Sequence, residues 1–366
     1  MKKALIVLVI AMIAISLALA GSACKTTTAE ETTAAAETTV AAEETTAAAE
    51  TSAEESVVAA EEELYIIAGG WWAYPVWKQL KYGAFKAAEF WTALGHPIKV
   101  ETVGPMEGDM DQIYAGLESA IAKNPKGIIY YCALGLSEAA IINPYLEKGG
   151  MIWGFAGSDS TEFTVTAKGG TDNAYYGELL GKKAIELAGE DAKVGIQTIA
   201  AATDHQARVA GIKKVFANYP NVKILQEMEE GPDPATGTAN ATAFIAANPD
   251  FDIMIGTGSL GGANTSAALK EAGIAAGDKK VLCGDITEDI LKYIRDGYIT
   301  ATLAQQFASE GFYAVTTMHL RGLNPAPLTA DDAKTGFLPG PVNLVMGNFW
   351  IDSSNIDLFE KLNEVE

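Results

Sequence analysis

The sequence predicts an α/β protein built from two similar lobes, each a doubly wound parallel sheet. Between residues 63 and 304, short runs of bulky apolar residues alternate with segments in which apolar residues recur at helical spacing. Such alternation is typical of parallel strands joined by right-handed crossovers. It passes through two successive series of similar length, and the roughly 300 residues after the N-terminal region are enough for two domains of ordinary size.

The first series opens with a buried strand at residues 65–68, which two glycines end. Trp77, Leu80 and Ala84 then follow at the spacing of a helix. The series continues with predicted strands at residues 98–103, 127–132, 151–155 and 164–166 and predicted helices at residues 109–123 and 137–148.

The second series begins at Thr171 and repeats the same pattern. Its predicted helices cover residues 175–188, 206–218, 239–247, 264–272 and 288–295, and its predicted strands cover residues 193–199, 223–228, 252–255, 280–283 and 299–304. Because the two series are alike in length and order, we expect two lobes of the same architecture.

The first 24 residues have the parts of a secretory signal: Lys2 and Lys3, an apolar run over residues 4–20, and small residues up to Cys24. The end of this segment resembles a bacterial lipobox, in which the cysteine becomes the lipidated first residue of the mature protein. Cleavage near Ala20 as an ordinary signal remains an alternative. We therefore expect an exported protein, periplasmic or on the cell surface, that is anchored to the membrane by a lipid on Cys24.

Residues 25–62 consist almost entirely of Thr, Ala and Glu and lack bulky apolar side chains. Such a segment cannot offset the entropy of ordering by burying apolar surface, so it is predicted to be a disordered tether. It contains ten glutamates and one lysine, for a charge of −9. With +2 from the two N-terminal lysines, the net charge of −21 leaves −14 for residues 63–366. An acidic folded part disfavours nucleic acid as a partner.

Cysteine and histidine are scarce. Cys132 and Cys283 both end strand-like runs, and we expect two buried thiols rather than a disulfide because the strands fall in different lobes. The three histidines show no paired spacing, so neither a metal nor another cofactor is expected.

An aromatic loop follows the first strand. Trp71, Trp72, Tyr74 and Trp77 lie close together there, and Pro75 with the flanking glycines keeps the first two tryptophans out of the helix. Ligands bind at the carboxyl ends of strands in open α/β sheets, where rigid aromatic rings offer flat apolar faces. We predict that Trp72, Tyr74 and Trp77 contact a ligand. The alternative is that the tryptophans are buried in the core.

Four short motifs follow one another in order: Pro75-Val76-Trp77 before Gly83, Arg208 three residues before Gly211, Asp285 directly after a strand, and Gln305 after another. In this order the chain resembles bacterial periplasmic sugar-binding proteins of the ribose and galactose type, from about residue 63 to about residue 350. The resemblance implies the type I periplasmic-binding-protein fold and binding of a monosaccharide or close relative between the lobes by hinge closure. It also implies a monomer that delivers its ligand to the permease subunits of an ABC importer.

The resemblance assigns ligand roles to Arg208, Asp285 and Gln305. Arginine offers a rigid fork of donors, aspartate accepts two hydroxyl protons, and glutamine does one of each, which suits the hydroxyl edge of a sugar. Each residue has a plain alternative: a solvated helix charge for Arg208, a helix N-cap for Asp285, and a hinge amide for Gln305.

Two departures from the family pattern leave the identity of the sugar open. Ser158 and Asp159 follow Ala156-Gly157 where ribose-type proteins have an Asp-Arg pair, and Gly258-Ser259 replaces the usual Asn-Asp. We predict ligand contacts for Ser158, Asp159 and Ser259, with a loop cap as the alternative for the first two.

Residues 256–261 match the pattern G-x-G-x-x-G between a strand and a helix, as in dinucleotide-binding loops. The nearest acidic residue in a suitable position, Asp285, is 29 residues beyond Gly256 and has a better role in the sugar site. We therefore interpret the match as coincidental.

Other functional classes have less support. An enzyme would need a catalytic constellation that no spacing indicates, since no G-x-S-x-G elbow occurs. A gene regulator would need a DNA-binding helix pair at the start of the chain. A receptor that serves chemotaxis or senses a furanose-type signal shares the fold and remains an alternative.

The chain is expected to cross between the lobes three times, near residues 170–172, 305–306 and 339–341. The N-terminal lobe would then comprise residues 63–170 and 306–339, and the C-terminal lobe residues 172–304 and 342–366. These crossings would form the hinge.

Overall fold

The structure is a computed structural model that describes residues 61–70, 72, 74, 76–106, 109–132, 138–160, 162–231, 234–335 and 340–359. The predicted secretory signal with Cys24, nearly all of the predicted tether, and Trp71 and Pro75 lie outside the described residues. No helix in the described part of the chain is long and apolar enough to cross a membrane.

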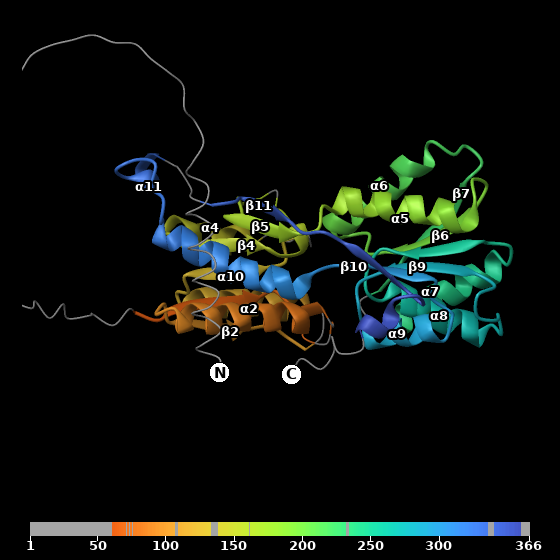
Figure 1. Ribbon diagram of the computed structural model, residues 1–366, viewed down its shortest axis with the longest axis horizontal. Coiled ribbons are helices and arrows are strands. Elements are labelled where there is room, and N and C mark those ends of the chain that lie inside the picture. The colour runs from red at the N-terminus through yellow and green to blue at the C-terminus, as the bar shows by residue number, and fades with distance from the viewer. Residues whose placement is uncertain are drawn as a thin grey trace, which may run out of the picture. The chain divides into compact units, whose positions relative to one another are not determined.

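The first lobe contains a six-stranded sheet in the order β11-β5-β4-β3-β1-β2, in which every pair of neighbours is parallel (Figure 1). Its strands are β1 (Glu63–Ala68), β2 (Ile98–Thr102), β3 (Gly127–Tyr130), β4 (Met151–Gly154), β5 (Ala167–Gly170) and β11 (Asn343–Val345). Helices α2 (Val76–Ala93) and α10 (Phe307–Leu323) share one apolar cluster with the sheet, while α3 (Met110–Ala122) and α4 (Ala139–Glu147) share the other. Alternate residues of β1 enter the two clusters, because successive side chains of a strand point to opposite faces.

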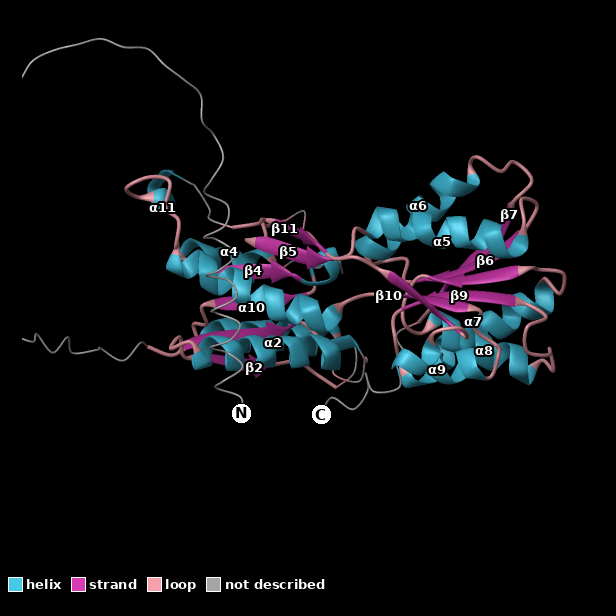
Figure 2. Cartoon of the chain, viewed as in Figure 1, coloured by secondary structure: helices cyan, strands magenta, loops and turns pink. Residues whose placement is uncertain are grey.

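The second lobe repeats this plan with the order β12-β10-β9-β8-β6-β7. Its strands are β6 (Lys193–Thr198), β7 (Lys223–Glu229), β8 (Ile253–Gly256), β9 (Lys280–Gly284), β10 (Ala301–Ala304) and β12 (Phe349–Asp352), of which β12 is antiparallel to β10. Helices α5 (Asn173–Ala188) and α6 (Thr203–Phe216) cover one face, and α7 (Pro234–Ala247), α8 (Gly261–Glu271) and α9 (Glu288–Arg295) cover the other (Figure 2).

The predicted fold class is confirmed: two α/β lobes with the same strand order are joined by three crossings. The first two crossings lie between β5 and α5 and between β10 and α10, near the predicted positions. The short pieces outside the sheets are the 3-10 turns η2 (Phe155–Gly157) and η3 (Ile356–Phe359) and the helix α11 (Asp332–Thr335). Cys132 and Cys283 are free and buried, as predicted.

The third crossing corrects the sequence analysis. The sequence predicts that residues 343–345 belong to the second lobe, but they form β11 and pair in parallel with β5 in the first sheet. The edge of β5 offers unpaired backbone groups, and Leu344 packs against the apolar cluster under α2 and α10. The chain therefore crosses between Val345 and Phe349, not at residues 339–341. The predicted strand at residues 164–166 is likewise displaced, because the pairing begins at Ala167.

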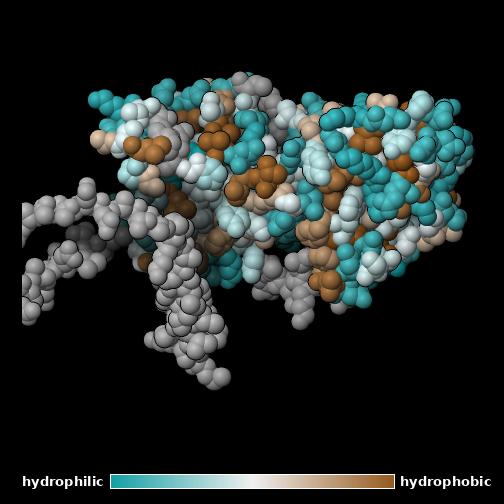
Figure 3. All heavy atoms as spheres, turned by 45° about the horizontal axis from the view of Figure 1, so that its top comes forward, coloured by the Kyte–Doolittle hydropathy of each residue, from teal (hydrophilic) through white to brown (hydrophobic). Residues whose placement is uncertain are grey.

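On the face shown in Figure 3, hydrophilic residues predominate and apolar residues lie among them. Exposed apolar side chains include Phe90 of α2 and Tyr313 of α10. Scattered exposed apolar residues of this kind are normal for soluble proteins.

Glycines allow the closest helix contacts in each lobe. A Cβ atom on Gly83 of α2 would lie 1.7 Å from the carbonyl oxygen of Ala308, and one on Gly211 of α6 would lie 2.2 Å from that of Ala174. Both distances are far below a van der Waals contact. The glycine of the predicted Arg-x-x-Gly motif therefore sets how near α6 lies to α5.

We expect Gly83→Ala to lower the free energy of unfolding by about 1–3 kcal/mol, because the added methyl group forces α2 away from α10. Gly116→Ala in α3 is the matched control, since a Cβ there would meet its nearest atoms at 3.5 Å. That change should be neutral or stabilising by up to about 1 kcal/mol. Urea unfolding of both variants measures the difference, and equal stabilities would contradict the packing argument.

Candidate ligand-binding site

A cavity lies where the carboxyl ends of strands from both sheets meet. Its empty volume is about 430 Å³, a figure that includes its open mouth. The lining residues are Tyr74, Val76, Trp77, Tyr131, Phe155, Ala156, Ile199, Asp204, His205, Arg208, Gly258, Asp285, Gln305 and Phe307. Five of the nine predicted site residues are among them: Tyr74, Trp77, Arg208, Asp285 and Gln305.

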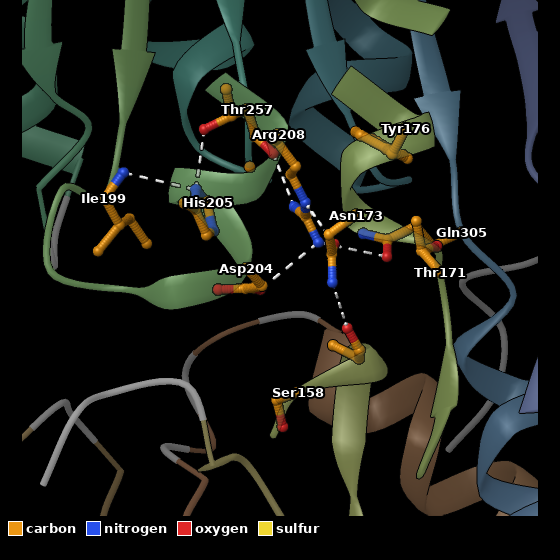
Figure 4. A network of polar contacts seen from close by, with 12 residues as sticks. Ser158, Thr171, Asn173, Tyr176, Ile199, Asp204, His205, Arg208, Thr257 and Gln305 are labelled. Atoms are coloured by element: carbon orange, nitrogen blue, oxygen red, sulfur yellow. Dashed lines mark hydrogen bonds and ion pairs between the residues drawn. The ribbon is translucent and has the colours of Figure 1, made fainter. Parts of the chain in front are cut away.

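Arg208 is the centre of the polar side of the cavity (Figure 4). It is 2% exposed, so it is not the solvated helix charge that the sequence left open. Its Nε donates to Asn173 Oδ1 at 2.8 Å, and its Nη1 donates to the carbonyl oxygen of Thr257 at 2.7 Å. The guanidinium also lies over the ring of Tyr176, 4.8 Å from the ring centroid. These contacts hold the plane of the guanidinium in one orientation.

The outer nitrogen of Arg208 connects it to two further cavity residues. Nη2 lies 3.6 Å from Asp204 Oδ2, an ion pair one helical turn away on α6. The same nitrogen lies 3.5 Å from Gln305 Oε1. Both distances are long, so these donors have room to shorten their bonds or to serve a ligand hydroxyl.

The close helix pair α5 and α6 positions Asn173 beside Arg208. Asp172 caps α5 by accepting from the backbone N–H of Tyr175, which leaves Asn173 as the first helical residue. From there Asn173 accepts from Arg208 and donates through Nδ2 to the carbonyl oxygen of Ala156 at 3.0 Å. One amide therefore connects the arginine to the end of β4 in the other lobe.

Asp285 occupies a strained turn directly after β9. Its φ is +68°, a left-handed conformation that non-glycine residues rarely adopt and that clusters at functional sites. The N-cap of α9 is Thr287, which accepts from Ile290 N, so the helix-cap alternative for Asp285 is excluded. Its carboxylate accepts from Ser259 Oγ and from Gln305 Nε2, the latter at 2.6 Å. Burial raises the pKa of Asp285.

Aromatic rings form the opposite side of the cavity. Trp77 packs against Phe155 with ring centroids 4.7 Å apart, and Phe155 packs against Phe307 at 5.4 Å. Trp77 is 1% exposed and belongs to the core cluster of the first lobe, so it is a core residue whose ring also borders the cavity. Trp72 lies behind it, half-buried, with its ring edge-on at 6.0 Å.

The sequence profile of the periplasmic binding protein domain matches residues 74–321. That span is more than half of the chain and includes every residue that lines the cavity. The chain belongs to this family. Membership implies an exported protein.

Solved structures of periplasmic binding proteins share the fold. One is an ABC transporter solute-binding protein from Burkholderia graminis in complex with D-arabinose, at 22% identity over 81% of this chain and 97% of that chain, with a TM-score of 0.71. Two are from Geobacillus stearothermophilus. GanP, a glucose-galactose binding protein, is 21% identical over 81% of this chain and 99% of that chain, with a TM-score of 0.69. AraP, an arabinose binding protein, is 21% identical over 82% of this chain and 99% of that chain, with a TM-score of 0.68. No curated protein matches the chain in sequence.

Among the remaining predicted residues of this periplasmic binding protein, Ser259 contacts the cavity through two lining residues: its Oγ donates to Asp285, and its backbone N–H donates to Tyr74 Oη at 3.4 Å. Ser158 and Asp159 lie elsewhere, along a second, polar depression at the hinge. Ser158 is buried and accepts from the backbone N–H of Cys132 at 3.0 Å, while Asp159 pairs with Lys168 at 2.7 Å. Ser158 therefore connects its loop to the end of β3, and Asp159 also accepts from the backbone N–H of Ser160 at 3.0 Å, which is a loop cap.

Sequence reasoning missed several lining residues of the cavity, notably Tyr131, Asp204 and His205. Tyr131 follows β3 and donates its hydroxyl to Asp204 Oδ1 at 2.8 Å. Asp204 and His205 precede Arg208 by four and three residues on α6, so helical spacing from the arginine was a signal that pointed to both. Burial lowers the pKa of His205 to about 4, which keeps its ring neutral.

The loop that matches G-x-G-x-x-G has an internal occupant in this periplasmic binding protein. Glu230, fully buried, accepts from the backbone N–H groups of Gly258 and Leu260 at 3.1 and 2.7 Å. Burial raises its pKa to about 7. The amides before α8 therefore hold a protein carboxyl group, the kind of partner that a helix N-terminus attracts.

Proposed function

We propose that this periplasmic binding protein is the extracytoplasmic substrate-binding component of an ABC importer, and that it binds a monosaccharide or close relative between its lobes. One observation carries the proposal: the cavity combines aromatic rings with a fixed set of bidentate polar groups. Arg208, Asp285 and Gln305 suit the hydroxyl edge of a sugar, and Trp77 with Phe155 suits its apolar face. The solved relative from Burkholderia graminis holds D-arabinose.

Ligand binding is coupled to closure of the lobes in this proposal. Within the described residues, hydrogen bonds already join the two lobes at the cleft: Tyr131 Oη to Asp204 Oδ1 at 2.8 Å, Gln79 Nε2 to the carbonyl oxygen of Ile286 at 3.1 Å, and Ser259 N to Tyr74 Oη at 3.4 Å, besides the bond from Asn173 to Ala156. A ligand that touches both sides only when the lobes are together shifts the equilibrium toward the closed form. The permease subunits then recognise the closed form.

The location follows from the N-terminal sequence. Export by the signal of residues 1–24 and a lipid on Cys24 place the protein outside the cytoplasmic membrane, with residues 25–62 as the tether. We also propose a monomer, as the resemblance to periplasmic sugar-binding proteins implies.

Titration calorimetry against pentoses, hexoses, polyols, amino acids and peptides tests the proposal. We expect at least one neutral monosaccharide or polyol to bind without added metal or nucleotide. Binding of an amino acid or peptide, with none of the sugars or polyols bound, would overturn it.

Intrinsic fluorescence is expected to change when the sugar binds, because Trp77 borders the cavity. Trp77→Phe should remove most of this change and weaken affinity several-fold, since a smaller ring keeps part of the stacking contact. Trp350→Phe on β12 is the control and should keep the full change, because Trp350 does not line the cavity. If Trp77→Phe keeps the full fluorescence change on sugar binding, Trp77 has a structural role only.

A further inference from the structure

The two sides of the cavity differ in chemistry. The first lobe and α10 contribute the side chains of Val76, Trp77, Phe155, Ala156 and Phe307, which we call the apolar wall. The second lobe and the β10–α10 crossing contribute the polar side chains of Asp204, His205, Arg208, Asp285 and Gln305, together with Ile199 and Gly258. A ligand between them meets carbon on one side and polar groups on the other.

The polar atoms that the first lobe does bring to the described lining are already engaged. The hydroxyl of Tyr131 donates to Asp204, and that of Tyr74 accepts from Ser259 N. The backbone of Ala156 is satisfied on both sides: its N–H donates to Glu310 Oε1 at 2.8 Å, and its carbonyl oxygen accepts from Asn173. A ligand hydroxyl that faces the side chains of the apolar wall would therefore lose its bonds to water, and only the remaining lone pairs of the two tyrosine hydroxyls and of the Ala156 carbonyl oxygen could replace them.

The buried carboxyl group of Glu310 supports the wall. Glu310, 1% exposed, also accepts from Trp153 Nε1 at 3.2 Å, and it fixes the left-handed turn at Ala156 where φ is +59°. That turn points Ser158 toward Cys132 N instead of the cavity. The polar residues that follow β4 in the sequence are thereby removed from the site.

We propose that the natural ligand is a deoxy sugar whose methyl group packs against the apolar wall while its ring hydroxyls bind the second lobe. This assignment rests on the proposed function, because it names the class of sugar for the same cavity. A hexose carries a hydroxymethyl group at the same position, and its hydroxyl would lie against the carbon atoms of the wall. A pentose carries a hydrogen atom there, which leaves part of the wall without contact. Both should therefore bind less tightly than the methyl sugar.

Sugars that share all ring hydroxyls and differ only at one substituent provide the test. Each series holds a hexose, its 6-deoxy form and the matching pentose: L-galactose, L-fucose and D-arabinose; D-galactose, D-fucose and L-arabinose; D-glucose, 6-deoxy-D-glucose and D-xylose; L-mannose, L-rhamnose and L-lyxose. Titration calorimetry on the full chain gives the dissociation constants. In the series that binds most tightly, we expect the methyl sugar to bind about tenfold or more tighter than the hydroxymethyl sugar and the pentose.

The outcomes separate the two proposals. A hydroxymethyl sugar or a pentose that binds as tightly as the methyl sugar in the best series overturns the present inference and leaves sugar binding intact. No binding in any series, together with binding of an amino acid or peptide, overturns the proposed function as well.

A variant of the apolar wall gives a second, independent readout. Val76→Thr replaces a methyl group by a hydroxyl at the start of α2, and we expect it to reduce the preference for methyl over hydroxymethyl at least about threefold. Val215→Thr makes the same change in the core of α5 and α6, away from the cavity, and should leave the preference unchanged. An unchanged preference in Val76→Thr would contradict the placement of the methyl group against this wall.

Discussion

Arg208→Ala is expected to lower the free energy of unfolding by about 3–5 kcal/mol and to abolish ligand binding. The guanidinium is 2% exposed, and its removal leaves Asp204 without its ion pair and Asn173 without its donor. A buried carboxylate without a compensating charge is the costly case. From the sequence alone one would expect a change in binding without a change in stability, but the structure predicts both.

Lys214→Ala is the matched control for Arg208→Ala. Lys214 also lies on α6, but its side chain is 75% exposed and pairs with Glu178 at the surface. Surface pairs of this kind contribute little, so this variant should unfold at the same urea concentration as the unmodified protein and bind normally. Arg208→Ala that retains full stability would show that the network around the guanidinium is dispensable.

Asp285→Asn is expected to weaken sugar binding by about 10- to 100-fold while the ligand-free protein stays as stable as before or becomes more stable. A hydrogen bond to a charged group contributes about 1.5–3 kcal/mol, and the neutral amide loses that contribution. Stability is preserved because asparagine tolerates the left-handed conformation at φ +68° and because the amide removes the cost of burying a charge, a cost that also raises the pKa of Asp285.

Asp285→Ala separates the backbone from the side chain in this test. Alanine disfavours the left-handed conformation, so this variant should lose stability as well as affinity. Calorimetry and thermal unfolding measure both quantities. Unchanged affinity in Asp285→Asn would remove the carboxylate from the ligand site.

The architecture could be predicted from the sequence because the apolar runs are short, bounded and repeated in a fixed order. Four successive residues are buried in each of β3, β4 and β8, as expected for strands that are covered on both faces. The same order brought Arg208, Asp285 and Gln305 to one cavity, since the carboxyl ends of parallel strands lie at one edge of a sheet.

Features that depend on tertiary contacts could not be predicted. β11 forms because the edge of β5 is free to pair, and its three residues carry no separate signal. Ser158 and Asp159 do not line the cavity, because the chain turns at Ala156 with φ +59°. An alanine in the sequence does not predict this left-handed conformation. The contact between Tyr131 and Asp204 joins residues 73 positions apart in different lobes, so only the packed structure reveals it.

Closure of the lobes around a sugar is the central claim, and the distance between two spin labels measures it most directly. Cysteines replace Lys86 on α2 and Lys292 on α9, both exposed, in a chain that also carries Cys24→Ser. Cys132 and Cys283 are buried, and burial raises the pKa of both thiols, so they stay unlabelled. Labels at Lys182 and Lys292, both in the second lobe, form the control pair, whose distance should not change.

With the sugar identified by calorimetry at saturating concentration, pulsed electron–electron double resonance is expected to show a shorter and narrower distance distribution between positions 86 and 292 than in the free protein. The control pair should give the same distribution in both conditions. An identical distribution for positions 86 and 292 with and without bound sugar would contradict closure as the response to the ligand.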